Sequence, residues 1–353
     1  MNNLAPEIKL FTAGDLADWL ATGHSTAGLS NEVISRCRAA AIAHNPYVHK
    51  DDPCVAAIYI NGKPVTFTAT FADNINGTVY RWFSTLWCNP EHRGKGYPLI
   101  AVGTLIEHYG AEKCLDMWGA PETVEIFRYF GHNDTTVPEY QFTPKSIRRD
   151  SLKGQAAYLL NKLKRNFGGG RTKQHRTFIE PTYRLQYTNT VDEETYCFIQ
   201  NHAGGDLIPR TREMLNWILA YHFMQRTPLL ASKEGGNPFH DCDSRYWMSG
   251  VKLFVDDRLA AFYILVDSDR GLSVKYLYYD KEYADCVFDS VARHVQTLRN
   301  PRFTTRHPQL ADYIDSMHLF DKKTIVPISF SYPPAFAFPA TAMSQGGDGD
   351  GFV

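Results

Sequence analysis

The two halves of the chain carry the same succession of predicted elements, and this repeat limits the possible folds more than any other feature. In the first half, two helices, three strands and a third helix are predicted in turn, at 16–20, 32–43, 54–60, 64–72, 79–88 and 99–109. In the second half, elements of the same kinds follow in the same order, at 192–201, 212–225, 246–255, 259–266, 272–279 and 283–298. Such a shared order indicates a duplicated unit.

Four segments are therefore expected along the 353 residues. Residues 1–143 form the first unit, residues 144–184 a basic helix and linker, residues 185–338 the second unit, and residues 339–353 a disordered, glycine-rich tail. The linker is marked by its charge, because residues 162–176 hold six basic side chains and no acidic one.

The composition excludes several classes of protein. Lysine and arginine number 37 against 38 aspartate and glutamate, so the formal net charge is −1 and no overall field attracts nucleic acid or an anionic membrane. Seven cysteines are scattered without a C-x-x-C pair, which favours a reducing compartment over a disulfide-stabilised secreted protein. The first residues lack the pattern of a secretory signal, and no apolar run is suited to spanning a membrane. We expect a cytoplasmic protein.

One segment carries specific chemistry. Arg93-Gly94-Lys95-Gly96 lies between the strand predicted at 79–88 and the helix predicted at 99–109. Glycines let a backbone turn tightly and bring its N–H groups against a phosphate, and a helix N-terminus adds unpaired donors and partial positive charge. The spacing is neither that of a Walker loop nor that of the dinucleotide fingerprint. The segment predicts an anion site of another kind.

The order of elements from about residue 7 to residue 143, together with the segment from Leu86 to Pro98, resembles the GNAT superfamily of acyl-CoA N-acyltransferases. The resemblance implies an α+β fold, a mixed α/β sandwich with two GNAT-like units, each a twisted mixed sheet flanked by helices. It also implies that acyl-CoA, most often acetyl-CoA, lies between splayed fourth and fifth strands, with no metal. The residues that it assigns to the cofactor are Leu86, Trp87, Cys88, Arg93, Gly94, Lys95, Gly96, Tyr97, Pro98 and Leu99.

The catalytic groups of the family are less clearly matched. Where the family often places an acidic tyrosine in its fourth helix, this chain has Phe127, and Tyr129 lies about 200° further round the helix. The strand at 79–88 contains no carboxylate to serve as a base. Three residues are therefore the catalytic candidates, namely Tyr129, Asp116 and Glu122, with Glu91 as a further nearby carboxylate.

The second unit is expected to be degenerate. At the position of the Arg93–Gly96 loop it has Asp280-Lys281-Glu282-Tyr283, which is largely acidic and has no glycine. His240-Asp241-Cys242-Asp243 is more typical of a polar loop than of a zinc site. Cys88, in an apolar strand, is expected to be an inert thiol rather than a nucleophile.

The sequence therefore predicts an N-acyltransferase that uses acyl-CoA, with acetyl-CoA favoured, and acts on an amine of a small metabolite or sugar. One alternative is an aminoacyl transferase similar to the Fem family, which takes its acyl group from charged tRNA, and the basic run at 162–176 is the feature that favours it. Another alternative is an inactive CoA-binding or scaffold protein. No membrane partner is expected, and the oligomeric state stays open.

Overall fold

The structure is a computed structural model. It describes residues 5–23, 28–144, 182–221, 246–268, 271–298, 300–338 and 342–349. The basic helix and linker and the segment at 240–243 fall outside these residues.

The described part of the first half contains six strands and four α-helices, in the order β1 (Glu7–Thr12), α1 (Ala13–Thr22), α2 (Arg36–Ala43), β2 (Pro53–Ile60), β3 (Lys63–Ile75), β4 (Thr78–Cys88), α3 (Tyr97–Tyr109), β5 (Cys114–Met117), α4 (Pro121–Tyr129) and β6 (Asn133–Thr143). The described part of the second half continues with β7 (Arg184–Thr188), α6 (Glu193–His202), α7 (Arg212–Ala220), β8 (Tyr246–Val255), β9 (Arg258–Ser268), β10 (Gly271–Tyr279), α9 (Ala284–Leu298), β11 (Phe303–Thr305), α10 (Pro308–Ser316) and β12 (Lys322–Tyr332).

Local sequence explains where several of these elements begin and turn. The β2–β3 turn places Asn61 and Gly62 at φ 52° and 75°, the left-handed pair that a two-residue hairpin requires. Thr12 caps α1, and Asp15 completes the capping box from within the helix, so α1 begins earlier than the expected 16–20. The helix expected at 32–43 begins only at Arg36, because Ser35 is its N-cap.

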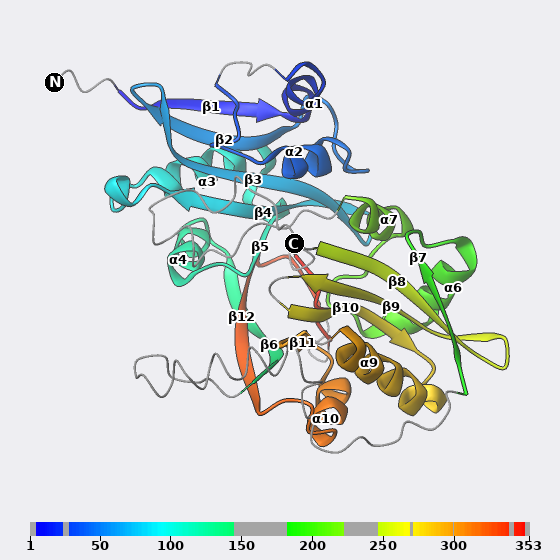
Figure 1. Ribbon diagram of the computed structural model, residues 1–353. Helices are drawn as coiled ribbons and strands as arrows, with labels where there is room; N and C mark the ends of the chain where they lie inside the picture. The colour runs from blue at the N-terminus through cyan, green and yellow to red at the C-terminus, as the bar shows by residue number, and fades with distance from the viewer. Residues whose placement is uncertain are drawn as a thin grey trace.

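The twelve strands of the described residues form one mixed sheet, in the order β1-β2-β3-β4-β5-β12-β6-β11-β10-β9-β8-β7. Within each half, three strand pairs are antiparallel and one pair, β4–β5 or β10–β11, is parallel. The final strands are exchanged, because β12 lies between β5 and β6, and β6 pairs with β11 of the second half. Figure 1 shows β12, in orange-red, beside β6 and below β5. The mixed α/β fold is thus continuous across both halves.

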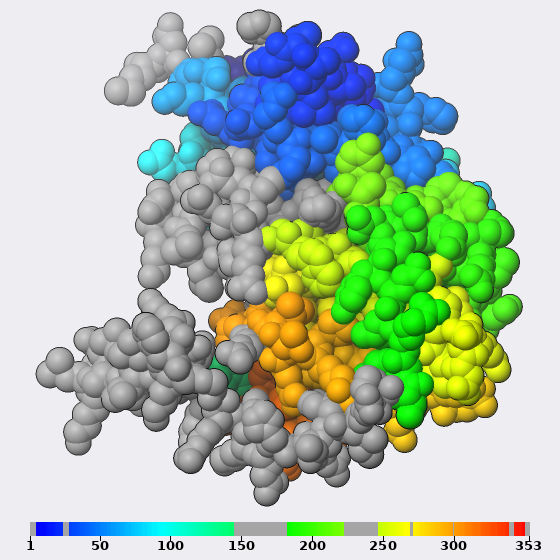
Figure 2. All heavy atoms as spheres, turned by 45° about the vertical axis from the view of Figure 1, so that its right-hand side comes forward, coloured from blue at the N-terminus to red at the C-terminus, as the bar shows by residue number. Residues whose placement is uncertain are grey.

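Apolar packing also joins the halves. The largest buried cluster contains residues from both, and Trp217 of α7 packs against Phe71 of β3 with ring centroids 5.7 Å apart. The indole N–H of Trp217 donates to the carbonyl oxygen of Ala41 at 2.8 Å. In the space-filling view, the green surface of the second half lies directly against the blue surface of the first (Figure 2). The surfaces around Trp217 and Phe71, where the halves meet, are therefore buried rather than exposed to solvent.

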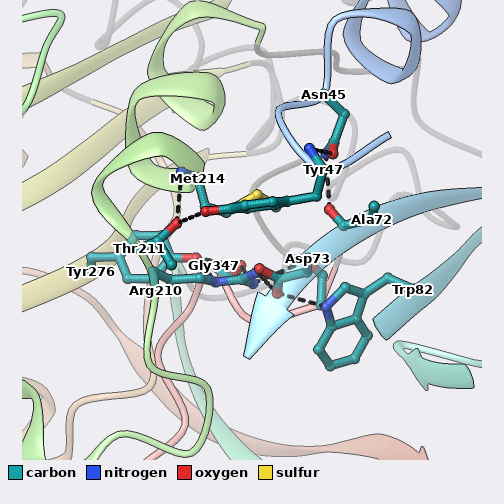
Figure 3. Close-up of polar contacts among 11 residues, drawn as sticks. Asn45, Tyr47, Ala72, Asp73, Trp82, Arg210, Thr211, Met214, Tyr276 and Gly347 are labelled. Carbon is teal, nitrogen blue, oxygen red and sulfur yellow. Dashed lines mark hydrogen bonds and ion pairs between the residues drawn. The ribbon is translucent and has the colours of Figure 1, made fainter. Parts of the chain in front are cut away.

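A buried ion pair crosses the same boundary. The guanidinium of Arg210 donates to the carboxylate of Asp73 at the end of β3, and neither side chain is exposed. The carboxylate also accepts from the indole N–H of Trp82 at 2.9 Å, and Arg210 donates to the hydroxyl of Tyr276 at 3.0 Å. Figure 3 shows this chain of contacts running from the first half to the second.

The prediction of a disordered tail is wrong for residues 342–349. Ser344, Gln345 and Asp348 are buried, and the carboxylate of Asp348 accepts from the Gln345 N–H at 2.8 Å. The glycine-rich composition predicts disorder. Because glycine has no side chain, however, the backbone of this segment can lie close against β10. The amide N–H of Gly347 donates to the carbonyl oxygen of Lys275 at 2.8 Å.

Among the described residues, no helix is long and apolar enough to cross a membrane. The same residues contain no group of three or more His, Cys, Asp or Glu side chains placed to hold a metal ion.

Candidate functional site

The candidate site lies where β4 and β5 separate. The two strands pair only from Arg81 to Phe83 on β4, against Cys114 to Asp116 on β5. β4 then continues to Cys88, past a bulge at which Thr85 takes a left-handed φ of 59°. From Ser84 onward, the β5-facing edge of β4 makes no strand pair within the described residues. Its backbone N–H and C=O groups are placed to bind an extended ligand.

The glycine loop connects this edge to α3. A short 3-10 helix, η1 (Pro90–His92), is capped by the side chain of Asn89, and the chain then bends at Gly94 and Gly96 with φ of 74° and 77°. Gly96 is the N-cap of α3, and no side chain caps the helix. A Cβ at either glycine would meet nothing within 4 Å. The space beside both glycines, at the N-terminus of α3, is therefore open.

The charge of the loop is available to a ligand. Arg93 and Lys95 are exposed, and neither forms an ion pair with another described residue. The nearest polar neighbour of Lys95 is the imidazole of His92, with Nζ 3.4 Å from Nδ1. Two exposed cations beside the positive end of a helix favour a phosphate or pyrophosphate.

Pro98 removes one donor from this site without disturbing the helix. It is the second residue of α3, where its N–H would have no partner in the helix. The first helical hydrogen bond runs from the Ile100 N–H to the Gly96 carbonyl oxygen at 3.1 Å. Tyr97 and Leu99 keep their amide N–H groups, and both side chains are half-buried.

The three catalytic candidates lie in different surroundings. Asp116 is 5% exposed and is the last β5 residue paired with β4, so it lies where the strands part. Its carboxylate rests against the backbone of Gly119, because a Cβ there would lie 2.4 Å from Oδ2. Glu122 is exposed in the first turn of α4, and Tyr129, at the end of α4, is 73% exposed. Only Asp116 is buried beside the strand opening.

Two nearby residues have structural roles. Phe127 is buried and packs edge-to-face against Phe83 of β4, with centroids 5.1 Å apart. A hydrophobic contact thus occupies the position at which the family resemblance would place a phenol. Cys88, half-buried at the end of β4, has its thiol pKa raised by burial. A protonated thiol is a poor nucleophile, which agrees with the inert role predicted for it.

The exchanged strand β12 adds residues that sequence reasoning missed. Ser331 pairs with Asp116 in the sheet, and its buried hydroxyl has no hydrogen-bond partner among the described residues. Ser329 accepts the Trp118 N–H through its carbonyl oxygen at 3.1 Å, and its hydroxyl donates to the Gly119 carbonyl oxygen at 2.7 Å. Residues more than 200 positions away in sequence therefore border the opening. Nothing in the local pattern of β12 indicates this.

The corresponding turn of the second half has a different character. Residues Lys281–Tyr283 form a short 3-10 helix, η4, that leads directly into α9 without a glycine bend. The carboxylate of Asp280 accepts from the imidazole of His202 at 2.9 Å and from Arg258 at 2.8 Å. A carboxylate held at this position repels a phosphate, whereas the loop of the first half would attract one.

Comparison with known proteins gives structural similarity without sequence similarity. No protein-family model and no curated protein matches the chain. A putative acetyltransferase from Pyrococcus horikoshii is 12% identical with a TM-score of 0.47, over 97% of this chain and 98% of that one. A tandem GNAT protein from the clavulanic acid biosynthesis pathway is 10% identical with a TM-score of 0.48, over 93% of this chain and 98% of that one. A GCN5-related N-acetyltransferase from Kribbella flavida is 13% identical with a TM-score of 0.47, over 92% of this chain and 70% of that one. At such identities the likeness concerns the fold alone.

Proposed function

We propose that the first half binds an acyl-CoA between β4 and β5 and transfers its acyl group to an amine. The observation that carries this proposal is the combination of a glycine-bent cationic loop at the uncapped N-terminus of α3 with the unpaired edge of β4 beside it. A pyrophosphate and an extended amide-containing arm are the two parts of CoA that such an arrangement can bind. Acetyl-CoA is the acyl donor that we favour.

In this arrangement, the amides of the loop and the first turn of α3 bind the pyrophosphate, and Arg93 and Lys95 pair with its charges. The backbone of Leu86 to Cys88 pairs with the pantetheine arm, which directs the thioester toward the point where β4 and β5 part. The acceptor is an amine on a small metabolite or sugar.

Transfer requires a deprotonated amine, a donor for the developing oxyanion and a proton for the leaving thiolate. Positioning alone supplies several kcal/mol of rate enhancement, and general acid–base help adds about 10²–10⁴-fold. Asp116 is the base that we propose, because it lies at the opening. Tyr129→Phe tests the phenol as the acid. A kcat about 10–100-fold lower at unchanged KM for acetyl-CoA supports that role, and an unchanged kcat points to water or to a residue of the second half as the proton donor.

A second candidate function, CoA binding without catalysis, is favoured by one observation, the burial of Phe127 against Phe83. The two functions differ in one measurement. An enzyme releases free CoA from acetyl-CoA in the presence of a panel of amines and amino sugars, whereas a binding protein does not.

The test of the cofactor site is Gly96→Val, with Gly62→Val as a matched control. Both glycines have nearly the same positive φ, 77° and 75°, and both face open space, but Gly62 lies in the β2–β3 turn. Loss of about two charge-assisted hydrogen bonds weakens acetyl-CoA binding by about 100-fold in Gly96→Val, while Gly62→Val binds as the unsubstituted protein does. Calorimetry measures both affinities, and circular dichroism confirms folding. A folded Gly96→Val protein that keeps its affinity would remove the cofactor assignment.

A further inference from the structure

The second half repeats the strand opening of the first. β10 pairs in parallel with β11 only at Leu272 and Ser273, and β4 pairs in parallel with β5 only from Arg81 to Phe83. In each half a bulge follows, after Val274 in β10 and after Ser84 in β4. Beyond its bulge, β10 continues to Tyr279 with no strand paired to its β11-facing edge among the described residues. The register places this edge where β4 has its candidate cofactor edge.

The C-terminal segment 343–349 lies against this edge. The Gly347 N–H donates to the Lys275 carbonyl oxygen at 2.8 Å, and the Leu277 N–H donates to the side-chain oxygen of Gln345 at 3.3 Å. On its other side, the segment forms a parallel bridge between Met343 and Asp206. The Met343 N–H donates to the Gly205 carbonyl oxygen at 2.7 Å, and the Leu207 N–H donates to the Met343 carbonyl oxygen at 2.9 Å. Segment 343–349 is thus held from both sides.

Two buried arginines bind its carbonyl oxygens. Arg210 donates to the carbonyl oxygens of Gly347 at 3.1 Å and Gly349 at 3.5 Å. Arg306 donates to the Ser344 hydroxyl at 2.5 Å and to the Gln345 carbonyl oxygen at 3.1 Å. Hydrogen bonds from charged donors are stronger than those between neutral groups. Backbone recognition of this kind is characteristic of a peptide site.

The groove also selects glycine. A Cβ at Gly346 would lie 2.7 Å from the Val274 carbonyl oxygen, and one at Gly347 would lie 2.3 Å from the Tyr276 ring. At Gly349, φ is 66° and a Cβ would lie 2.6 Å from the Met117 Cβ on β5. The shape of the groove and the glycines of the segment therefore fit each other, and the segment reaches a strand of the first half.

We propose that the opening beside β10 is a peptide-binding groove whose occupant is the chain's own C-terminal segment 343–349. The second half keeps the splayed strands of the repeat but uses them to bind segment 343–349 instead of a phosphate-bearing ligand. This proposal is independent of whether the first half binds acyl-CoA, because every contact that supports it lies outside the Arg93–Gly96 loop.

Hydrogen exchange on the full-length protein gives the first test. The Met343 and Gly347 amides exchange at least about 100-fold more slowly than in a free synthetic peptide of residues 342–349, because each donates a hydrogen bond to a backbone carbonyl oxygen of the second half. Exchange as fast as in the free peptide would overturn the proposal without any substitution being made.

The second test opens the groove. Gly347→Ala forces a methyl group against Tyr276, whereas the control Gly204→Ala meets nothing within 4 Å. Fluorescence anisotropy then measures binding of a labelled peptide of residues 342–349. We expect the peptide to bind Gly347→Ala, and to bind the unsubstituted protein and Gly204→Ala at least about 10-fold more weakly, because their own segment competes. The same peptide carrying Gly347→Ala should not bind. Equal binding to all three proteins, or none to a folded Gly347→Ala protein, would refute the groove.

Discussion

The buried pair between Arg210 and Asp73 gives the most stringent test of how the two halves are joined. Both side chains are fully buried, and one oxygen of Asp73 already lacks any hydrogen-bond partner in the described structure. Arg210→Met keeps most of the side-chain volume but removes the charge. The carboxylate is then left with the Trp82 N–H as its remaining donor.

Removing one member of a buried ion pair costs about 3–5 kcal/mol, because the other charge stays desolvated. Burial already raises the pKa of Asp73, and the nearby Arg210 charge lowers it. Loss of Arg210 therefore raises that pKa further. When the pKa of Asp73 is higher in the folded protein than in the unfolded chain, the free energy of unfolding decreases as pH rises. Arg210→Met is therefore most destabilising at pH 8, where the unpaired carboxylate is charged, and less destabilising at pH 5.

The assay is urea unfolding followed by tryptophan fluorescence and far-ultraviolet circular dichroism, on Arg210→Met, Asp73→Asn and the double variant. Trp82 and Trp217 lie at the boundary between the halves, so fluorescence reports its loss directly. We expect the double variant to be less destabilised than the sum of the single variants, by at least about 1 kcal/mol. The reasoning fails if Arg210→Met costs less than about 1 kcal/mol at pH 8, or if the two costs simply add.

Two further predictions follow from buried carboxylates. Asp116→Asn lowers kcat by about 100-fold while KM for acetyl-CoA stays unchanged. Steady-state kinetics measures this beside Glu107→Gln, which changes an exposed carboxylate on α3 and keeps the unsubstituted kcat; an Asp116→Asn protein with that same kcat would remove Asp116 as the base. Burial, together with the charge of Asp348, raises the pKa of Asp206 to about 7. The folded protein therefore binds this proton more tightly than the unfolded chain does, so the free energy of unfolding falls as pH rises from about 4 to 8. The decrease is about 4 kcal/mol at most. Asp206→Asn flattens this dependence in urea unfolding across that range, and an unchanged slope would contradict the assignment.

Much of the fold could be predicted because its signals are local. Asn61-Gly62 specifies a hairpin through the backbone freedom of two residues, and the strand and helix on either side of the Arg93–Gly96 loop follow from hydrophobic periodicity. The glycine loop is similarly local, because its geometry depends on two positive φ angles that the sequence itself permits. The short strand β11 was not predicted, since three residues carry too little pattern to be recognised.

The sequence by itself determined the order of the elements, the repeat and the cationic loop, since each depends on residues within one or two turns of chain. Only the tertiary structure decided which strands meet. The exchange of β6 and β12, which brings Ser331 beside Asp116, depends on the competition of two similar strands for the same sheet edge. β6 and β12 can form the same backbone hydrogen bonds with a neighbouring strand, so side-chain packing across the whole sheet decides which of the two pairs there. The tail was misjudged for a related reason: glycine gives a free chain the most conformational freedom, but it also lets the backbone approach β10 more closely than any other residue could.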